Sequence, residues 1–423
     1  MKKEISLGMI LIFAISLVQA FSLNESHQTD WVNGTYYVCD CAEGADQNCI
    51  AGNDNNTGKD INRPWKTFER ANRRFSPIWN DYSEVPLQMK AGGTIAFCKG
   101  GSFEVKYQTS WGNYNCTSET PCFIRDYNPP WASGDEDKPY IFNKNATAVW
   151  NMLRLGGKQH GLIIKNLEFY GNDNTGGISG YGDYKDILID NVVVRNSSLG
   201  VYIPASTGNS NRGIILRNSL IYDCRGQGWL GGGNNILIEN NYFKNNGYAR
   251  TVLNHNIYAS NSVNMTIKNN LLYKSAIVGG NCTGVSLVVH GRTYNLLIEN
   301  NTVWEDVGAS GQGCWGIAVD GGYAEWEEFN GTIIRGNKVI NVGNVAIGVS
   351  SCPNCIIENN VVIHDQPYGT NGIAVPDRTR GSNDTIMTNV SVRFNSMYFG
   401  NGGTGIVISG IGFNNSIREG KNF

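Results

Sequence analysis

Short apolar segments that alternate with polar residues recur along most of the chain. One such unit spans residues 235–260, where the apolar segment 236–238 leads into the pair Asn240-Asn241 and a second short segment follows at 256–259. Each segment alternates with a period of two residues and is too short for a helix, so we expect β-strands. Because the unit returns many times, the repeat determines the expected fold.

The first residue of each polar pair defines a column along the sequence. The column reads Asn166, Asn191, Asn218, Asn240, Asn269, Asn300, Gly336, Asn359 and Phe394. Successive members are 25, 27, 22, 29, 31, 36, 23 and 35 residues apart, so the shortest spacing sets the basic coil and the longer ones contain insertions. A second column of strands follows the pairs, at 200–203, 316–319, 372–375 and 405–408. One coil could not bury its apolar side chains alone, whereas stacked coils form a continuous core.

This pattern resembles the right-handed parallel β-helix of the pectate-lyase-like superfamily over about residues 150 to 410. The resemblance implies an all-β solenoid whose successive parallel strands lie roughly 4.8 Å apart. Equivalent asparagines are expected to form a hydrogen-bonded ladder at a tight corner, as part of the scaffold. The expected organisation is a signal peptide at 1–20, a cysteine-rich cap with the first coils at 21–149, and the repeat domain at 150–423.

The region before the repeats contains a predicted amphipathic helix that carries Phe68, Ala71 and Phe75 on one face. Its order of strand, helix and glycine-rich turns is similar to the N-terminal cap of many secreted bacterial β-helix proteins, polysaccharide lyases included. Such a cap covers apolar side chains and strand edges at the open end of the core. The last predicted coil ends at residue 413. We expect further chain or an association to cover that end.

The N-terminus predicts export. Lys2 and Lys3 precede an apolar run at 7–18, and residues 18–20 form a small-residue cleavage site, which is typical of a signal peptide and too short for a membrane anchor. The chain has 34 Lys and Arg against 36 Asp and Glu, a net charge of −2 without a basic run. This balance argues against nucleic acid as a partner. We expect a secreted protein, extracellular or periplasmic, without a membrane anchor.

Eleven cysteines follow the predicted leader, and in an exported protein they are expected to form disulfides. The odd total leaves one unpaired, and Cys224 is the candidate because no other cysteine lies near it in sequence. Cys352 and Cys355 have the spacing of a redox motif. They fall at a turn of the repeat instead of a helix start, so a redox role is disfavoured.

Alternation within the second strand column leaves a row of outward positions. By this register His290 and Asp320 lie on adjacent coils, Arg292 follows His290 by two residues, and His255 opens the strand that carries Tyr258. Further residues near this edge form the candidate substrate-binding set: Tyr202, Trp229, Tyr258, Trp315, Asp377 and Arg378. Aromatic faces flanked by polar groups suit sugar rings, which present apolar C–H faces and hydroxyl edges.

Polysaccharide lyases of this fold remove the proton α to a uronate carboxylate. This reaction requires a base and a positive charge against the carboxylate. By this resemblance His290 or His255 is the base, Arg292 is the carboxylate partner, and Asp320 is a calcium ligand or an orienting group. The leading expectation is therefore a secreted lyase acting on an acidic extracellular polysaccharide, with Ca²⁺ as the candidate cofactor.

Two other classes of protein remain open. A glycoside hydrolase on this scaffold needs two carboxylates across the groove, such as Asp320 with Glu325 or with Asp306. A non-enzymatic glycan-binding or adhesive surface protein needs only the rigid face. The sequence lacks the dense aspartate cluster of pectate lyases and the Asp-Pro-His run of alginate epimerases. Fold alone does not decide between these functions.

Overall fold

The computed structural model describes residues 34–76, 89–144, 149–180, 182–204, 211–249, 253–311, 313–322, 326–376, 383–409 and 418–419 of the 423-residue chain. The predicted signal peptide at 1–20 lies outside these residues, as do Asp377, Arg378 and the end of the last predicted coil at 413.

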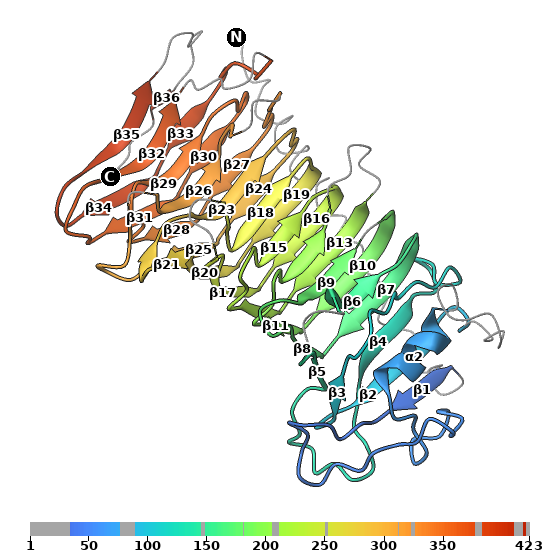
Figure 1. Ribbon diagram of the computed structural model, residues 1–423. Coiled ribbons are helices and arrows are strands. Elements are labelled where there is room, and N and C mark those ends of the chain that lie inside the picture. The colour runs from blue at the N-terminus through green and yellow to red at the C-terminus, as the bar shows by residue number, and fades with distance from the viewer. Residues whose placement is uncertain are drawn as a thin grey trace, which may run out of the picture.

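Nearly all of the described strands belong to three long parallel sheets (Figure 1). Each coil gives one strand to each sheet, as β16 (Asn234–Glu239), β17 (Tyr242–Asn246) and β18 (Ile257–Ser260) show. In Figure 1 the strands follow one another from the blue N-terminal end to the red C-terminal end of an elongated stack. The fold is the right-handed parallel β-helix that the repeat predicted.

Within each of the three sheets the described strands follow one another in chain order. The 13-stranded sheet consists of β1 (Thr35–Val38), β2 (Thr94–Cys98), β4 (Cys122–Tyr127), β7 (Gln159–Lys165), β10 (Tyr184–Asp190), β13 (Arg212–Arg217), β16, β19 (Val263–Lys268), β24 (Leu297–Glu299), β27 (Ile333–Arg335), β30 (Ile356–Glu358), β33 (Ser391–Arg393) and β36 (Arg418–Glu419). The 11-stranded sheet consists of β3 (Ser102–Glu104), β5 (Tyr140–Phe142), β8 (Glu168–Tyr170), β11 (Val193–Arg195), β14 (Leu220–Tyr222), β17, β20 (Leu271–Ser275), β25 (Thr302–Trp304), β28 (Lys338–Ile340), β31 (Val361–His364) and β34 (Ser396–Phe399). The 10-stranded sheet consists of β6 (Asn151–Leu155), β9 (Gly176–Gly180), β12 (Val201–Ile203), β15 (Trp229–Gly231), β18, β23 (Val285–His290), β26 (Trp315–Val319), β29 (Val345–Val349), β32 (Thr370–Pro376) and β35 (Gly403–Ser409). A small antiparallel pair joins β21 (Ile277–Val278) to β22 (Asn281–Cys282).

The predicted cap helix is present as α2 (Phe68–Phe75), beside β1 at the N-terminal end of the stack (Figure 1). The hydroxyl of Thr67 caps its N-terminus by accepting a backbone N–H. Phe68, Ala71 and Phe75 are buried as predicted, and the Phe68 ring centroid lies 5.0 Å from that of Trp111. The helix therefore extends the apolar core at this end. Among the described residues, none of the helices has the length and apolar character to cross a bilayer.

The asparagine column marks the corner between the 13-stranded and 11-stranded sheets. All nine members have a positive φ, between 53° and 66°. Asparagine and glycine tolerate this left-handed conformation, which most side chains disfavour. Phe394 is the bulky exception, and its side chain is 56% exposed. The column is thus explained by backbone conformation, in agreement with its predicted scaffold role.

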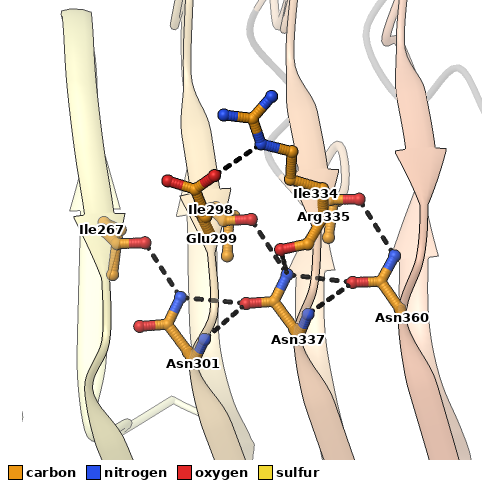
Figure 2. A network of polar contacts seen from close by, with 8 residues as sticks. All are labelled: Ile267, Ile298, Glu299, Asn301, Ile334, Arg335, Asn337 and Asn360. Carbon is orange, nitrogen blue, oxygen red and sulfur yellow. Dashed lines mark hydrogen bonds and ion pairs between the residues drawn. The ribbon is translucent and has the colours of Figure 1, made fainter. Parts of the chain in front are cut away.

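The continuous ladder is formed by the second residue of the last six pairs, one position later than the predicted column, and Figure 2 shows three of these residues. The side-chain carbonyl of Asn337 accepts the backbone N–H of Asn301 at 2.9 Å and its side-chain amide at 3.0 Å. Asn337 in turn donates to Asn360 at 3.0 Å and to the carbonyl of Ile298 at 2.9 Å. The same arrangement links Asn241, Asn270, Asn301, Asn337, Asn360 and Asn395. Each buried amide is satisfied by the next coil.

The residue before each corner asparagine alternates in charge on the outer face of the 13-stranded sheet. This charged row reads Lys165, Asp190, Arg217, Glu239, Lys268, Glu299, Arg335, Glu358 and Arg393. Ion pairs join neighbours at 3.1, 3.2, 2.6 and 2.8 Å, and Figure 2 shows the pair of Glu299 with Arg335. A coil shifted by one repeat would place like charges side by side, so the row favours the observed stacking order.

The cysteines pair as the odd total predicted. The five disulfides are Cys39–Cys98, Cys41–Cys49, Cys116–Cys122, Cys282–Cys314 and Cys352–Cys355. Cys224 is the free cysteine, and burial raises its pKa to about 12, so the thiol stays protonated and unreactive in the folded protein.

Replacing one ladder residue tests the contribution of the ladder to stability. Asn337→Ala should lower the free energy of unfolding by about 1–3 kcal/mol for each buried group left without a partner. Chemical denaturation measures this change. Asn354→Gly is the matched control, because it removes an exposed amide that donates to Asn330 and accepts from Asn389, and it retains the positive φ. We expect a change of less than about 0.5 kcal/mol there. Equal losses in both variants would contradict a special role for the buried ladder.

Candidate functional site

The predicted outward row lies on the 10-stranded sheet in the expected register. Tyr202 is aligned with Leu230, Tyr258, Val288 and Ala318 on successive strands. Tyr202 and Tyr258 are partly exposed, whereas Val288 and Ala318 are nearly covered. The row therefore presents aromatic rings toward the N-terminal half of the sheet and small side chains beyond β18. His290 and Asp320 lie two residues further along their coils.

His290 ends β23 between an aromatic ring and a buried acid. Its ring centroid lies 5.4 Å from that of Tyr258, and its Nδ1 lies 3.4 Å from Oε1 of Glu327. The Glu327 side chain is fully buried, while that of His290 is 15% exposed. The same Glu327 oxygen accepts the backbone N–H of Gly291 at 2.8 Å. The carboxylate thus lies against one edge of the imidazole, and the exposed part of the ring can meet a ligand.

Two further carboxylates lie beside this pair. Asp320 accepts a hydrogen bond from the Ser350 hydroxyl, which itself accepts the backbone N–H of Gly321 at 2.9 Å. Asp384 accepts the backbone N–H of Glu327 at 2.8 Å. A Cβ on Gly321 would lie 3.2 Å from a Glu327 oxygen and 3.6 Å from an Asp384 oxygen. The acids therefore close around this glycine, which gives three buried carboxylates from two different coils.

Arg292 supplies the positive charge next to the site. Its guanidinium lies 5.2 Å from the ring centroid of Trp326, which is 45% exposed. The backbone N–H of Arg292 donates to Asn261 at 3.1 Å, and its strand segment pairs with Glu328. Stacking on the indole holds the cation at the protein surface, where it can meet an anionic ligand. The predicted trio of His290, Arg292 and Asp320 thus lies in one region of the molecule.

The alternative base His255 is in a different environment from His290. It is only 3% exposed, and its Nδ1 lies 2.9 Å from the carbonyl oxygen of Val285. Burial lowers the pKa of His255 to about 3, so the imidazole is neutral. Its ring centroid lies 5.6 Å from that of Tyr258. This geometry favours a supporting position beneath Tyr258 and favours His290 as the base.

The remaining predicted binding residues do not form one set. Trp229 is fully buried and aligned with the core residues Val201 and Ile257, so its prediction as a sugar-binding residue is wrong. It precedes the outward Leu230 by one position, and strand alternation turns it inward. Trp315 is partly exposed but opens its strand, at the opposite end from Asp320. Asp377 and Arg378 lie outside the described residues.

The structure separates Asp320 from Asp306, one of its two predicted acid partners, and leaves the predicted calcium site untested. Asp306 lies beyond β25 of the 11-stranded sheet and pairs with Lys274 at 2.8 Å, so it is not a partner of Asp320. Glu325 lies outside the described residues. A calcium site needs six to eight converging oxygen ligands. In the described ranges, the sole group of three acidic, histidine or cysteine side chains with converging ligand atoms contains Glu305 and the disulfide Cys282–Cys314. Calcium binding by Asp320 stays a prediction.

Sequence reasoning missed Glu327 and Asp384. Both lie in the longest insertions of the repeat, the coils with spacings of 36 and 35 residues. Long insertions on a regular scaffold frequently carry functional residues, so insertion length was an available signal. The acidic run at 325–328, which includes Trp326, was a second signal that could have pointed to Glu327.

The comparisons agree with this fold. The family model described as right handed beta helix region matches residues 152–325. The chain is thus a right-handed parallel β-helix protein. A search of curated proteins finds no match.

Two solved structures share the architecture. The Dettilon tailspike protein superposes with a TM-score of 0.54 at 12% identity, over 75% of this chain and 62% of the tailspike chain. This chain therefore spans less than two thirds of the tailspike's length. XylC in complex with xylose superposes with a TM-score of 0.53 at 8% identity, over 89% of this chain and 86% of that one. At these identities the likeness shows the fold alone.

The buried His255 predicts a pH dependence of stability. Its pKa is about 3 in the folded chain, against 6.5 for an ordinary histidine. Between these values the unfolded chain binds a proton that the folded chain does not. The free energy of unfolding therefore falls as the pH drops below about 6.5.

His255→Gln should remove this contribution. The stability of the wild type relative to the variant should fall by up to a few kcal/mol between pH 8 and pH 4. Denaturant titrations at both pH values measure it, and the difference at pH 8 reports the packing change alone. A difference that is the same at both pH values would show that His255 is not held neutral by burial.

Proposed function

We propose that this protein is secreted and cleaves an acidic polysaccharide by β-elimination, with His290 as the base. The observation that carries the proposal is the His290–Glu327 pair, with Nδ1 and Oε1 3.4 Å apart, beside Arg292. Five disulfides and the predicted leader support export. The similar fold of XylC, solved with xylose, adds support for a sugar ligand by analogy only.

The residues present can perform the elimination as follows. Glu327 faces Nδ1 of His290 and favours a proton there, which makes Nε2 the basic nitrogen. Nε2 takes the proton from the carbon α to the uronate carboxylate. The electron pair of that C–H bond forms the new C=C bond, and the glycosidic C–O bond at the β carbon breaks. The leaving oxygen takes a proton from the imidazolium, so the base is regenerated.

The other groups of the site support this reaction. Arg292 can pair with the uronate carboxylate and stabilise the negative charge that develops on it. The exposed face of Trp326 and the ring of Tyr258 offer stacking surfaces for the sugars on either side. Positioned proton transfer of this kind contributes about 10²–10⁴-fold to the rate.

A glycoside hydrolase is the second candidate because Asp320, Glu327 and Asp384 gather around Gly321. Two of these carboxylates could serve as acid and as base or nucleophile. The products separate the two mechanisms. Elimination gives an unsaturated sugar that absorbs in the ultraviolet, whereas hydrolysis gives new reducing ends without that absorbance. A non-enzymatic binder gives neither product.

We expect ultraviolet-absorbing product from at least one of pectin, alginate and glycosaminoglycans, measured with calcium and then with chelator. His290→Ala should lower the rate by about 10²–10⁴-fold. Glu327→Gln should lower it less and change the pH profile, because the orienting charge is lost. His160→Ala, on the 13-stranded sheet, is the matched control and should leave the rate unchanged.

Two results would contradict the lyase. New reducing ends without absorbance, lost in Asp320→Asn, would establish the hydrolase. Glycan binding without any product across the panel would establish the non-enzymatic binder.

A further inference from the structure

The outer face of the 11-stranded sheet carries a row of aromatic and cationic side chains. One residue from each of six successive strands lies in register with the next: Tyr170, Arg195, Tyr222, Lys244, Tyr273 and Trp304. We call these six residues the aromatic–cation row. It spans five strand spacings of roughly 4.8 Å, or about 24 Å along the helix axis. It lies on a different sheet from His290 and Asp320.

The rings and cations of the row contact one another. The Arg195 guanidinium lies 4.8 Å from the ring centroid of Tyr170 and bonds to Glu168 at 2.6 Å. The ring centroids of Tyr273 and Trp304 are 4.9 Å apart at an angle of 37°, and Trp304 is 42% exposed. These contacts hold flat apolar surfaces at fixed spacing. Ordered rings of this kind lose little entropy when a ligand stacks on them.

A hollow lies at the N-terminal end of the row. It encloses about 440 Å³ and is lined by Tyr140, Phe142, Tyr170 and Arg195, with Glu43 and Lys144 at its edge. Tyr140 and Phe142 are stacked, with centroids 5.2 Å apart, and Arg195 lies 5.4 Å from the Tyr140 centroid. Lys144 is paired with Glu43. The row thus begins in a concave, partly aromatic site of the kind that binds small ligands.

The charges of this face differ from those of the 13-stranded sheet. There the outward charges alternate, and ion pairs join Asp190, Glu239, Glu299 and Glu358 each to a neighbouring cation. On the outward positions from β8 to β28 of the 11-stranded sheet there are three cations, Arg195, Lys244 and Lys338, and one acid, Glu168. Among the described residues, Lys244 and Lys338 have no acidic partner. These strand positions therefore carry two more cations than acids, while Asp306 beyond β25 pairs with Lys274 and accepts the Tyr273 hydroxyl.

We propose that the aromatic–cation row is a binding surface for a linear acidic polysaccharide. One side chain per coil at constant spacing suits an extended polymer with a regular repeat. The rings suit sugar C–H faces, and the cations between them suit carboxylates. The proposal does not rest on the lyase reaction, since the row and His290 are on different sheets.

Other occupants fit the face less well. The inner strands of the sheet are paired on both sides, so a peptide cannot add to them as a further strand. Single-stranded nucleic acid also stacks on rings, but it carries a charge on every nucleotide, and the face offers only three cations. A second copy of this chain would bring its own cations against these. Each occupant is an arm of the test.

The experiment measures binding of polygalacturonate, alginate and hyaluronate to the full chain, in the wild type and in His290→Ala. Tyr273→Ala with Trp304→Ala should raise the Kd at least tenfold for the polymers that bind. Lys244→Glu should raise the Kd and reduce its dependence on salt, because one ion contact is lost. Trp150→Ala is the matched control: this tryptophan is 69% exposed and directly precedes β6 of the 10-stranded sheet, not a strand of the row, so the Kd should not change.

Several results would overturn the proposal. They are a Kd that is unchanged in both the aromatic and the Lys244 variants, equal binding of neutral xylan, or equal binding of a thymidine oligonucleotide with the same mutational pattern. Sedimentation that shows a dimer lost in Trp304→Ala would assign the face to a second copy. Thermal melts confirm that the variants fold.

The outcome is separable from that of the proposed reaction. Cleavage by the wild type with unchanged binding in the row variants would remove this inference and leave the lyase. Binding lost in the row variants with no cleavage on any polymer would remove the lyase and leave this inference.

Discussion

The structure depends on one constraint: the polar groups of every coil must find hydrogen-bond partners on the neighbouring coils, one strand spacing away. Backbone bonds do this within the sheets, and the buried asparagine ladder does it at the corner where the chain turns. Because an amide both donates and accepts, each asparagine can bond to the coil before and the coil after. The corner residue before it must adopt a left-handed conformation, which asparagine also tolerates. The repeated Asn-Asn pair therefore serves two different physical needs at adjacent positions.

This constraint fixes the inward side chains and leaves only two places for chemistry, the outward positions of the strands and the insertions between them. The three outer faces use this freedom differently. The 13-stranded sheet neutralises its charges by alternation, which favours correct stacking. On the 10-stranded sheet, the outward residue His290 lies against Glu327, which belongs to an insertion. The 11-stranded sheet presents rings together with Lys244 and Lys338, for which the described residues supply no acidic partner. The regular row of ion pairs between coils and these two lysines are thus on separate faces.

The sequence was sufficient for the fold because the period of the repeat and the alternation within strands are local properties. It placed His290, Asp320 and Tyr258 on the outer face, and it identified Cys224 as the free thiol. Trp229 was misplaced although alternation alone turns it inward. The burial of His255 could not be predicted from the sequence, because it depends on how neighbouring coils cover that end of the strand. Glu327 and Asp384 were missed because irregular insertions have no periodicity to fix their position.

The placement of these missed acids distinguishes His290 from a histidine on a bare outer face of the solenoid. A histidine on a bare solenoid face would be solvated and free to rotate. Here the 36-residue coil folds back so that Glu327 is buried behind the imidazole, and the 35-residue coil brings Asp384 to the Glu327 backbone. Neither insertion is needed for stacking, since the spacings of 22 and 23 residues elsewhere complete a coil without one. The two longest departures from the repeat therefore meet at Glu327, which one supplies and the other contacts through Asp384. This is the arrangement expected when a regular scaffold acquires a site through its loops.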